Sequence, residues 1–255
     1  MKRIGLLFIL VFLMGASMQI FPDRTREAEL YAAVEQGDFP TAEKLLKAGA
    51  NPNGWDLIPI VETQRTCIGR AVELGHFDIV DLLLKSGADP ALPVADMFGS
   101  PIKEAIKQKQ TGIVKLLLQY GADIHETGFN GESLLHMAAE SGSIEMVELF
   151  LAKGLKLDSR DEGGRSLLLY TIPGGQTAMF DYLADKGLDA HEKDGEGHSG
   201  IYYAALFGQL EMVQHLQAKG FDLNEKGSDG RGLLDAARDS MNDELIEYLQ
   251  SKGLE

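Results

Sequence analysis

The sequence predicts an all-α solenoid of about seven helix-turn-helix repeats joined by hairpin loops. The first observation is a glycine that recurs 38 residues apart, then 34, and then 33 in each later interval. Glycine readily adopts the left-handed conformation that ends a helix, so each of these glycines is expected to close one repeat. They are Gly49, Gly87, Gly121, Gly154, Gly187, Gly220 and Gly253.

Two further registers repeat with the same period. Sixteen positions before each closing glycine, where helices must approach closely, stand Ala33, Ala71, Ala105, Ala138, Thr171, Ala204 and Ala237. A hydroxyl stands twenty-one positions before the glycine in five repeats, and its oxygen can cap the first helix. These residues are Thr66, Ser100, Ser133, Ser166 and Ser199. Agreement between independent registers indicates a true repeat.

The clearest copy lies at residues 131–154. Its apolar pattern predicts a first helix from about Ser133 to Ser141 and a second from about Ile144 to Ala152, separated by Gly142. Helices this short are unstable alone in water. Each pair must therefore bury its apolar face against neighbouring copies.

The segment Ser-Leu-Leu-His-Met-Ala-Ala at residues 133–139 resembles the ankyrin repeat, whose signature is Thr-Pro-Leu-His-x-Ala on a period of about 33 residues. The resemblance implies an ankyrin-repeat domain of about seven repeats over residues 26–255. It also implies a concave face lined by first helices and hairpin loops. Departures exist, because only Pro101 keeps the proline of the signature and only His136 keeps its histidine.

The N-terminus has the layout of a signal peptide over residues 1–18. Lys2 and Arg3 precede an apolar run from Ile4 to Met14, and small residues follow at 15–17. A cleaved signal peptide predicts a periplasmic or secreted protein. The alternative is an uncleaved membrane anchor, because the weakly interrupted apolar stretch 4–21 is about the minimum length for a span.

Composition limits the choice of partners. The chain has 255 residues and a formal net charge of −15, which argues against nucleic acid as the main partner. The charge is compatible with a basic protein surface, or simply with solubility. The single cysteine, Cys67, cannot form an intramolecular disulfide, and its register favours a half-buried packing role.

Three segments depart from the regular pattern. The link at residues 54–65 carries the extra residues and holds Trp55, either as an apolar contact or as a loop folded over the first repeat. The loop at residues 89–98 has two prolines and an apolar tip that includes Phe98. Pro173 is expected to shorten the first helix of the fifth repeat.

Candidate partner-binding residues follow from the registers of the first helices. Met137, Tyr170 and Tyr203 stand seventeen positions before their closing glycines and should form a ladder, with Leu206 and Phe207 near its end. Large aromatic side chains at partly exposed positions are favoured as interface anchors. The alternative is that the tyrosines fill gaps between neighbouring first helices. The further candidates are Leu74, Trp55, Phe98 and Phe129.

No residue pattern indicates catalysis, a cofactor or a metal. The sequence has no Gly-x-Ser-x-Gly and no His-Glu-x-x-His. His191, His198 and Asp194 could be read as metal ligands, but solvated side chains in turns explain them better. The acidic residues of the loops at 158–164, 191–198 and 224–230 are likewise expected in exposed turns, with nothing to shift their pKa.

These observations predict a non-enzymatic protein–protein interaction module, exported to the cell envelope, that binds another protein through its concave face and loops. The alternative is a dedicated inhibitor, such as an immunity protein that neutralises a toxin or enzyme in the periplasm. We expect a monomer whose partner presents a basic surface, with no nucleic acid bound. Membrane contact is expected only if the N-terminal segment stays uncleaved.

Overall fold

The computed structural model describes residues 24–54, 65–94, 99–228 and 230–254. These residues form fourteen helices in seven pairs, α2 to α15, so the predicted all-α repeat architecture is confirmed. The chain divides into two compact units, one ending at Asp123 and one beginning at Ile124. Each unit is described by itself.

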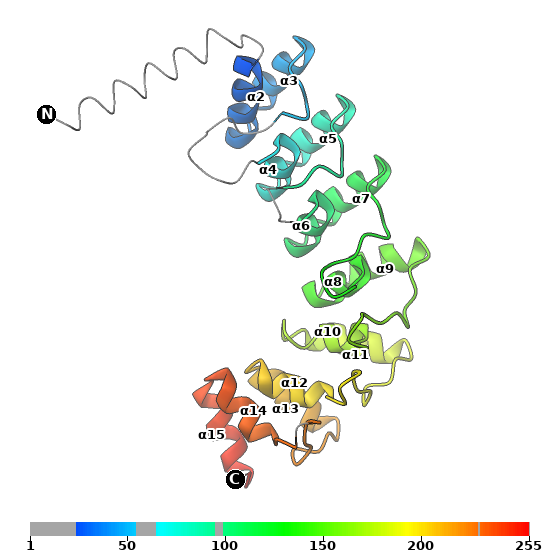
Figure 1. Cartoon of the computed structure of the whole chain (residues 1–255), viewed down its shortest axis with the longest axis vertical. Helices are drawn as coiled ribbons and strands as arrows, with labels where there is room; N and C mark the ends of the chain where they lie inside the picture. The colour runs from blue at the N-terminus through cyan, green and yellow to red at the C-terminus, as the bar shows by residue number, and fades with distance from the viewer. Residues whose placement is uncertain (1–23, 55–64, 95–98, 229, 255) are drawn as a thin grey trace, which may run out of the picture. The chain divides into compact units, whose positions relative to one another are not determined.

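The first unit contains three helix pairs (Figure 1). The first helices stack α2 on α4 and α4 on α6, while the second helices stack α3 on α5 and α5 on α7. Apolar side chains of both rows meet between the layers, and Leu30, Ile68, Leu83, Ile102 and Leu117 are fully buried there. The pairs are α2 (Arg24–Gln36) with α3 (Phe39–Lys47), α4 (Cys67–Glu73) with α5 (Phe77–Lys85), and α6 (Pro101–Lys107) with α7 (Thr111–Gln119).

The second unit contains four helix pairs, whose first helices pack in the order α8, α10, α12 and α14 (Figure 1). A single antiparallel bridge closes the hairpin before each pair, at Thr127–Ser133, Arg160–Ser166, Lys193–Ser199 and Lys226–Gly232, which confirms the hairpin loops. The pairs are α8 (Leu134–Ser141) with α9 (Ile144–Ala152), α10 (Leu167–Tyr170) with α11 (Thr177–Asp185), α12 (Gly200–Leu206) with α13 (Leu210–Ala218), and α14 (Leu233–Ser240) with α15 (Asp243–Ser251).

The turns of each repeat use the left-handed backbone conformation. Every closing glycine has a positive φ, for example 97° at Gly154. The turn between the two helices of a pair does the same, and glycine fills it in five repeats. Lys109 and Met241 occupy the other two turns and still adopt φ angles of 58° and 54°. The fold imposes this conformation even where the side chain disfavours it.

Helix capping by the repeated hydroxyl is only partly as predicted. The Thr66 oxygen accepts a hydrogen bond from the backbone N–H of Gly69 at 3.0 Å. The prediction is wrong for Ser100, Ser166 and Ser199, whose side chains make no capping bond. The backbones of Ser166 and Ser199 take part in the hairpin bridges, and each hydroxyl oxygen is buried without a partner in the described residues.

The fifth repeat has the short first helix that Pro173 predicts. Helix α10 spans only four residues, Leu167–Tyr170. The chain that follows passes close to the preceding repeat, because a methyl group at Gly174 would lie 2.8 Å from the carbonyl oxygen of Glu140. This approach brings Pro173 beside α8.

Several predictions concern residues outside the described ranges. The signal peptide or anchor at residues 1–18 or 4–21, Trp55 in the link and Phe98 in the second loop all belong to this group. Among the helices that the structure does describe, none combines the length and the apolar character needed to cross a membrane.

Candidate partner-binding site

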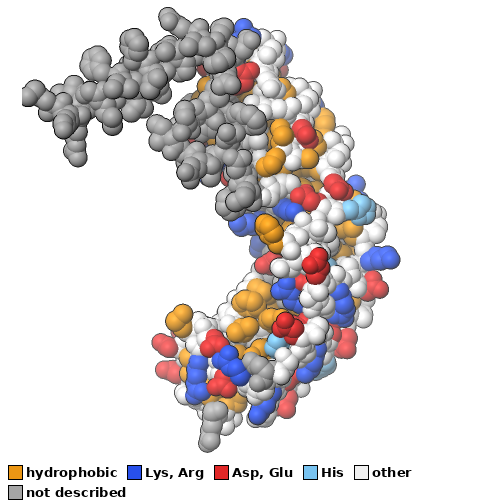
Figure 2. All heavy atoms as spheres, in the orientation of Figure 1, with side chains coloured by type: hydrophobic (Ala, Val, Ile, Leu, Met, Phe, Trp, Pro, Cys, Tyr) orange, Lys and Arg blue, Asp and Glu red, His pale blue; other side chains and the backbone are white. Residues whose placement is uncertain are grey.

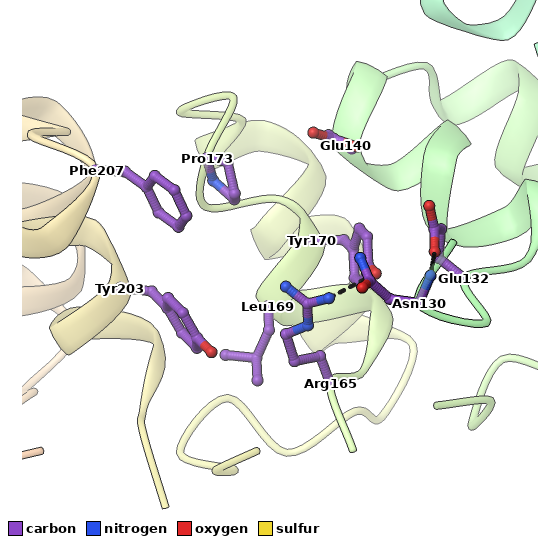
Figure 3. Close-up of a pocket in the computed structure, with 9 residues that line it drawn as sticks. All are labelled: Asn130, Glu132, Glu140, Arg165, Leu169, Tyr170, Pro173, Tyr203 and Phe207. Carbon is purple, nitrogen blue, oxygen red and sulfur yellow. Dashed lines mark hydrogen bonds between the residues drawn. The ribbon is translucent and has the colours of Figure 1, made fainter. Parts of the chain in front are cut away.

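A cavity of about 290 Å³ lies on the first-helix side of the second unit, over the fourth, fifth and sixth repeats (Figure 3). Several of its lining residues stand at equivalent positions of neighbouring repeats. Seventeen positions before the closing glycine stand Tyr170 and Tyr203, and fourteen before it stand Glu140 and Pro173. The full lining is Asn130, Glu132, Glu140, Arg165, Leu169, Tyr170, Pro173, Tyr203 and Phe207.

Two lining residues, Arg165 and Tyr170, are held in place by a buried carboxylate, that of Asp161. One of its oxygens accepts from the backbone N–H of Arg165 at 2.8 Å, and the other accepts from Arg165 Nε at 2.7 Å and the Tyr170 hydroxyl at 2.8 Å. Burial alone would raise the pKa of Asp161, but these hydrogen bonds and the Arg165 charge outweigh it and hold the pKa below its usual value. The guanidinium also lies 5.0 Å from the centre of the Tyr170 ring.

The sixth repeat builds the same arrangement a second time. Asp194 accepts the Tyr203 hydroxyl at 2.6 Å and the backbone N–H of His198 at 2.8 Å. Burial opposes the charged form, yet these bonds hold the pKa of Asp194 below its usual value. The expectation that the acidic hairpin residues are solvated and unshifted is therefore wrong for Asp161 and Asp194. Each carboxylate lies under a tyrosine nine positions later in the chain.

The fourth repeat lacks both members of that pair. Gly128 stands where the later repeats have aspartate, and Met137 stands where they have tyrosine. The Glu132 carboxylate folds back into the hairpin instead and accepts the backbone N–H of Asn130 at 2.8 Å. A methyl group at Gly128 would collide with this carboxylate. Glu132 thus takes over the turn-stabilising role from a different position of the repeat.

An aromatic wall closes one side of the cavity (Figure 3). The Tyr203 and Phe207 rings stack with an interplanar angle of 14° and a centroid distance of 5.9 Å. Phe207 is 46% exposed. Phe129, which precedes the lining residue Asn130, is 98% exposed at the tip of its hairpin. Exposed apolar side chains that gather beside a pocket indicate a candidate interaction site, whereas single exposed ones do not.

Glu140 faces this wall from α8, with Pro173 between them (Figure 3). Within the described residues it makes no hydrogen bond and no ion pair. The surrounding protein atoms raise the pKa of its carboxylate, the charge of Glu132 adds to the effect, and the charge of Arg165 opposes it. Glu140 is exposed to solvent, and its carboxylate lacks the hydrogen bonds that Asp161 and Asp194 receive.

The predicted site residues divide into three groups. Tyr170, Tyr203 and Phe207 line the cavity, although Tyr170 is itself buried. Met137 and Leu206 are half-buried and do not line the cavity, and Phe129 and Leu74 are exposed, the latter in the first unit. Trp55 and Phe98 lie outside the described residues. Their roles in binding stay predictions.

The remaining lining residues were not identified from the sequence. The repeat pattern could have pointed to some of them. Pro173 and Glu140 stand fourteen positions before their closing glycines, as the predicted residue Leu206 does. Arg165 and Glu132 also share a register, directly before the repeated serine. Reading every residue of these two registers would have found Glu132, Glu140, Arg165 and Pro173, but not Asn130 or Leu169, which lie in other registers.

His191 and His198 make separate ring contacts. His191 stacks on Phe221 with a centroid distance of 4.1 Å, and His198 stacks on Tyr202 at 4.8 Å. His198 Nδ1 lies 3.5 Å from an Asp194 oxygen. In the ranges covered by the structure, no group of three His, Cys, Asp or Glu side chains is arranged to hold a metal ion.

Comparison with known families gives three matches. A sequence model described as ankyrin repeats in three copies matches residues 102–194, and one described as ankyrin repeats in many copies matches residues 172–217. A model of the single ankyrin repeat matches residues 63–93. No curated protein matches the chain. The matched segments cover α4 to α13 except Pro101 and Ala218, and they include every residue that lines the cavity.

Proposed function

The chain belongs to the ankyrin-repeat family, and from this we propose that it is a non-enzymatic module that binds a protein partner through the first-helix face of its second unit. Ankyrin repeats are protein–protein interaction modules. The observation that carries the choice of face is the cavity lined by the exposed ring of Phe207, with the exposed Phe129 directly before the lining residue Asn130 in the chain.

The chemistry of this face supports protein binding. Partly exposed aromatic side chains next to a pocket are typical anchors of protein interfaces. The lining of the cavity itself combines charged side chains such as Glu132 and Arg165 with apolar ones such as Phe207. Figure 2 shows charged and hydrophobic side chains interspersed on the visible side of the second unit as well. A mixed surface of this kind offers both apolar anchors and polar contacts.

Partner capture with the full chain as bait tests this proposal. Replacing Phe129 and Phe207 by alanine should abolish capture of one stoichiometric partner from a native extract. The matched control replaces Phe77 and Ile144, two exposed apolar residues that begin second helices, by alanine. The control should capture normally, and both variants should keep the wild-type unfolding midpoint. Equal capture by the two variants would contradict the choice of face.

Export to the cell envelope is the second part of the proposal. It is supported by the basic residues Lys2 and Arg3, the apolar run from Ile4 to Met14 and the small residues that follow. The intact mass of the protein from its native source should correspond to loss of about the first 18 residues. Retention of the segment in a membrane fraction would favour the anchor at residues 4–21 instead.

A dedicated inhibitor is a specific form of the same function. The net charge of −15 and the carboxylates around the cavity favour a partner with a basic surface, as the rim of an active site can be. Once a partner is captured, its activity should be measured with and without this protein. Stoichiometric inhibition would establish the immunity role, and unchanged or increased activity would indicate a supporting role.

A further inference from the structure

We propose that the cavity binds an arginine side chain of the partner protein, with the guanidinium group beside Glu140 and the aliphatic stem along Tyr203, Phe207 and Pro173. The inference rests on the proposed function and names the chemistry that the partner must present. It is carried by a comparison between Glu140 and a carboxylate at the same place in another repeat.

That carboxylate is Glu73 in the second repeat, which also stands fourteen positions before its closing glycine. Two arginines of the chain neutralise it. Glu73 Oε2 lies 3.0 Å from Arg70 Nη1 and 3.2 Å from Arg65 Nη1. The protein thus shows by itself that a guanidinium group fits beside a carboxylate in this register.

The fourth repeat keeps the carboxylate and lacks both arginines. Met137 stands in the register of Arg70, and Glu132 stands in the register of Arg65. The remaining cation of the cavity, Arg165, is already held by Asp161 at 2.7 Å and lies over the Tyr170 ring. Carboxylates therefore outnumber cations around the cavity, and Glu140 is the one left without a partner in the described residues.

The rest of the lining suits arginine better than a compact cation. The stacked rings of Tyr203 and Phe207 offer a flat aromatic surface, on which a guanidinium group or the methylene stem can pack. Pro173 and Leu169 add apolar contacts. A volume of about 290 Å³ is at the small end of ligand pockets, so it has room for one long side chain.

Glu140 is exposed to solvent, so its carboxylate is accessible to a partner. The surrounding protein atoms and the charge of Glu132 raise its pKa, and the charge of Arg165 opposes this rise. Because water still reaches the carboxylate, Glu140→Gln should leave the unfolding midpoint unchanged.

A titration followed by NMR of the full chain tests the proposal directly. The probe is the capped tripeptide acetyl-Gly-Arg-Gly-amide, and two matched peptides replace arginine by norleucine or by glutamate. We expect shifts of the signals of Arg165, Tyr203 and Phe207 with the arginine peptide only. Glu140→Gln should weaken this binding by about tenfold. Glu211→Gln, which removes an equal charge from the exposed side of α13, should not weaken it.

Each other outcome overturns the inference. Equal shifts with the norleucine peptide would show an apolar pocket without charge recognition. No saturable shift with arginine, or equal binding to Glu140→Gln, would remove Glu140 from recognition. Free arginine that binds much more tightly than the capped peptide would indicate a small-molecule site. A partner captured through Phe129 and Phe207 but indifferent to Glu140→Gln would leave the proposed function standing while the arginine pocket falls.

Discussion

Asp161 and Asp194 connect the hairpins to the binding face at the level of single residues. Each accepts hydrogen bonds from its own hairpin backbone and from a tyrosine hydroxyl on the following helix. Both carboxylates are almost fully buried, so these bonds replace the water that a surface aspartate would bind. The lining of the cavity is consequently anchored from below.

The lowered pKa values of these two aspartates predict how stability changes with pH. When the pKa of a carboxyl group is lower in the folded than in the unfolded protein, its charged form stabilises the fold at any pH above the unfolded-state pKa. This stabilisation is lost as the pH falls through the folded-state pKa. We therefore expect the free energy of unfolding, measured with urea, to fall steeply below about pH 4. The Asp161→Asn plus Asp194→Asn variant should be less stable at pH 7 and should show a shallower fall. An equal fall would assign the pH dependence to other carboxylates.

Cys67 gives a second prediction at this scale. The side chain is fully buried, more deeply than the expected half-buried role, and burial raises the pKa of its thiol to about 12, with the charge of Glu27 adding to the effect. The reactive thiolate is thus suppressed in the folded protein. Labelling with a thiol reagent at pH 8 should be slow in buffer and should accelerate in urea along the unfolding curve. Rapid labelling of the native protein would contradict this burial.

Among the elements, the turn between paired helices offers a test of backbone strain. Lys109 adopts a φ of 58°, which disfavours any residue with a Cβ. Lys109→Gly should raise the free energy of unfolding by about 0.5–1 kcal/mol, because the relief of strain exceeds the added freedom of the unfolded chain.

The matched reverse change is Gly154→Ala. This glycine has a φ of 97° and no atom within 4 Å of an added methyl group, so only backbone strain opposes the substitution. We expect a loss of about 1 kcal/mol in the same urea assay. Equal stability of both variants and the wild type would show that the turns relax without cost.

The packing of neighbouring first helices is tested by enlarging the small residue of the repeat. Ala138 and Ala204 are both fully buried. Changing either residue to leucine should overpack the contact with the adjacent helix and lower stability by about 1–3 kcal/mol. Ala152→Leu, at the exposed C-terminal end of α9, is the control and should have a smaller effect. No destabilisation of Ala138→Leu would undermine the repeat register.

Most elements could be predicted from the sequence because the repeat is read in many copies at once. The second helix at Ile144–Ala152 and the shortening of α10 before Pro173 agree with expectation. The cavity was harder to predict, since it depends on which polar side chains fold inward. Asp161 looks like any turn aspartate until the tyrosine above it is seen in the structure. Glu140 is recognisable as unpaired only against the ion-paired Glu73.

Over the whole molecule, stability should be local, because repeat proteins are stabilised mainly by interfaces between adjacent repeats. Leu249→Ala removes a fully buried side chain of α15 and should cost about 2–5 kcal/mol in that repeat. Backbone amides should show the largest loss of protection from hydrogen exchange in α14 and α15 and a smaller loss in α12 and α13. The protection of α2 to α7 should not change. A uniform loss over all helices would show that the chain unfolds as a single cooperative block.

The stacked arrangement of aspartate under tyrosine limits how the recognition surface can be redesigned. Replacing Tyr203 alone would leave the buried Asp194 carboxylate without its hydroxyl donor. A change of binding specificity at this position would therefore lower the stability of the fold. The same chain already contains compatible alternatives, since Gly128 accompanies Met137 and Gly227 accompanies Ala236. The aspartate position of the hairpin and the tyrosine position of the following helix should therefore be exchanged as a pair. A library that varies both positions together should retain far more folded members than one that varies the tyrosine position alone.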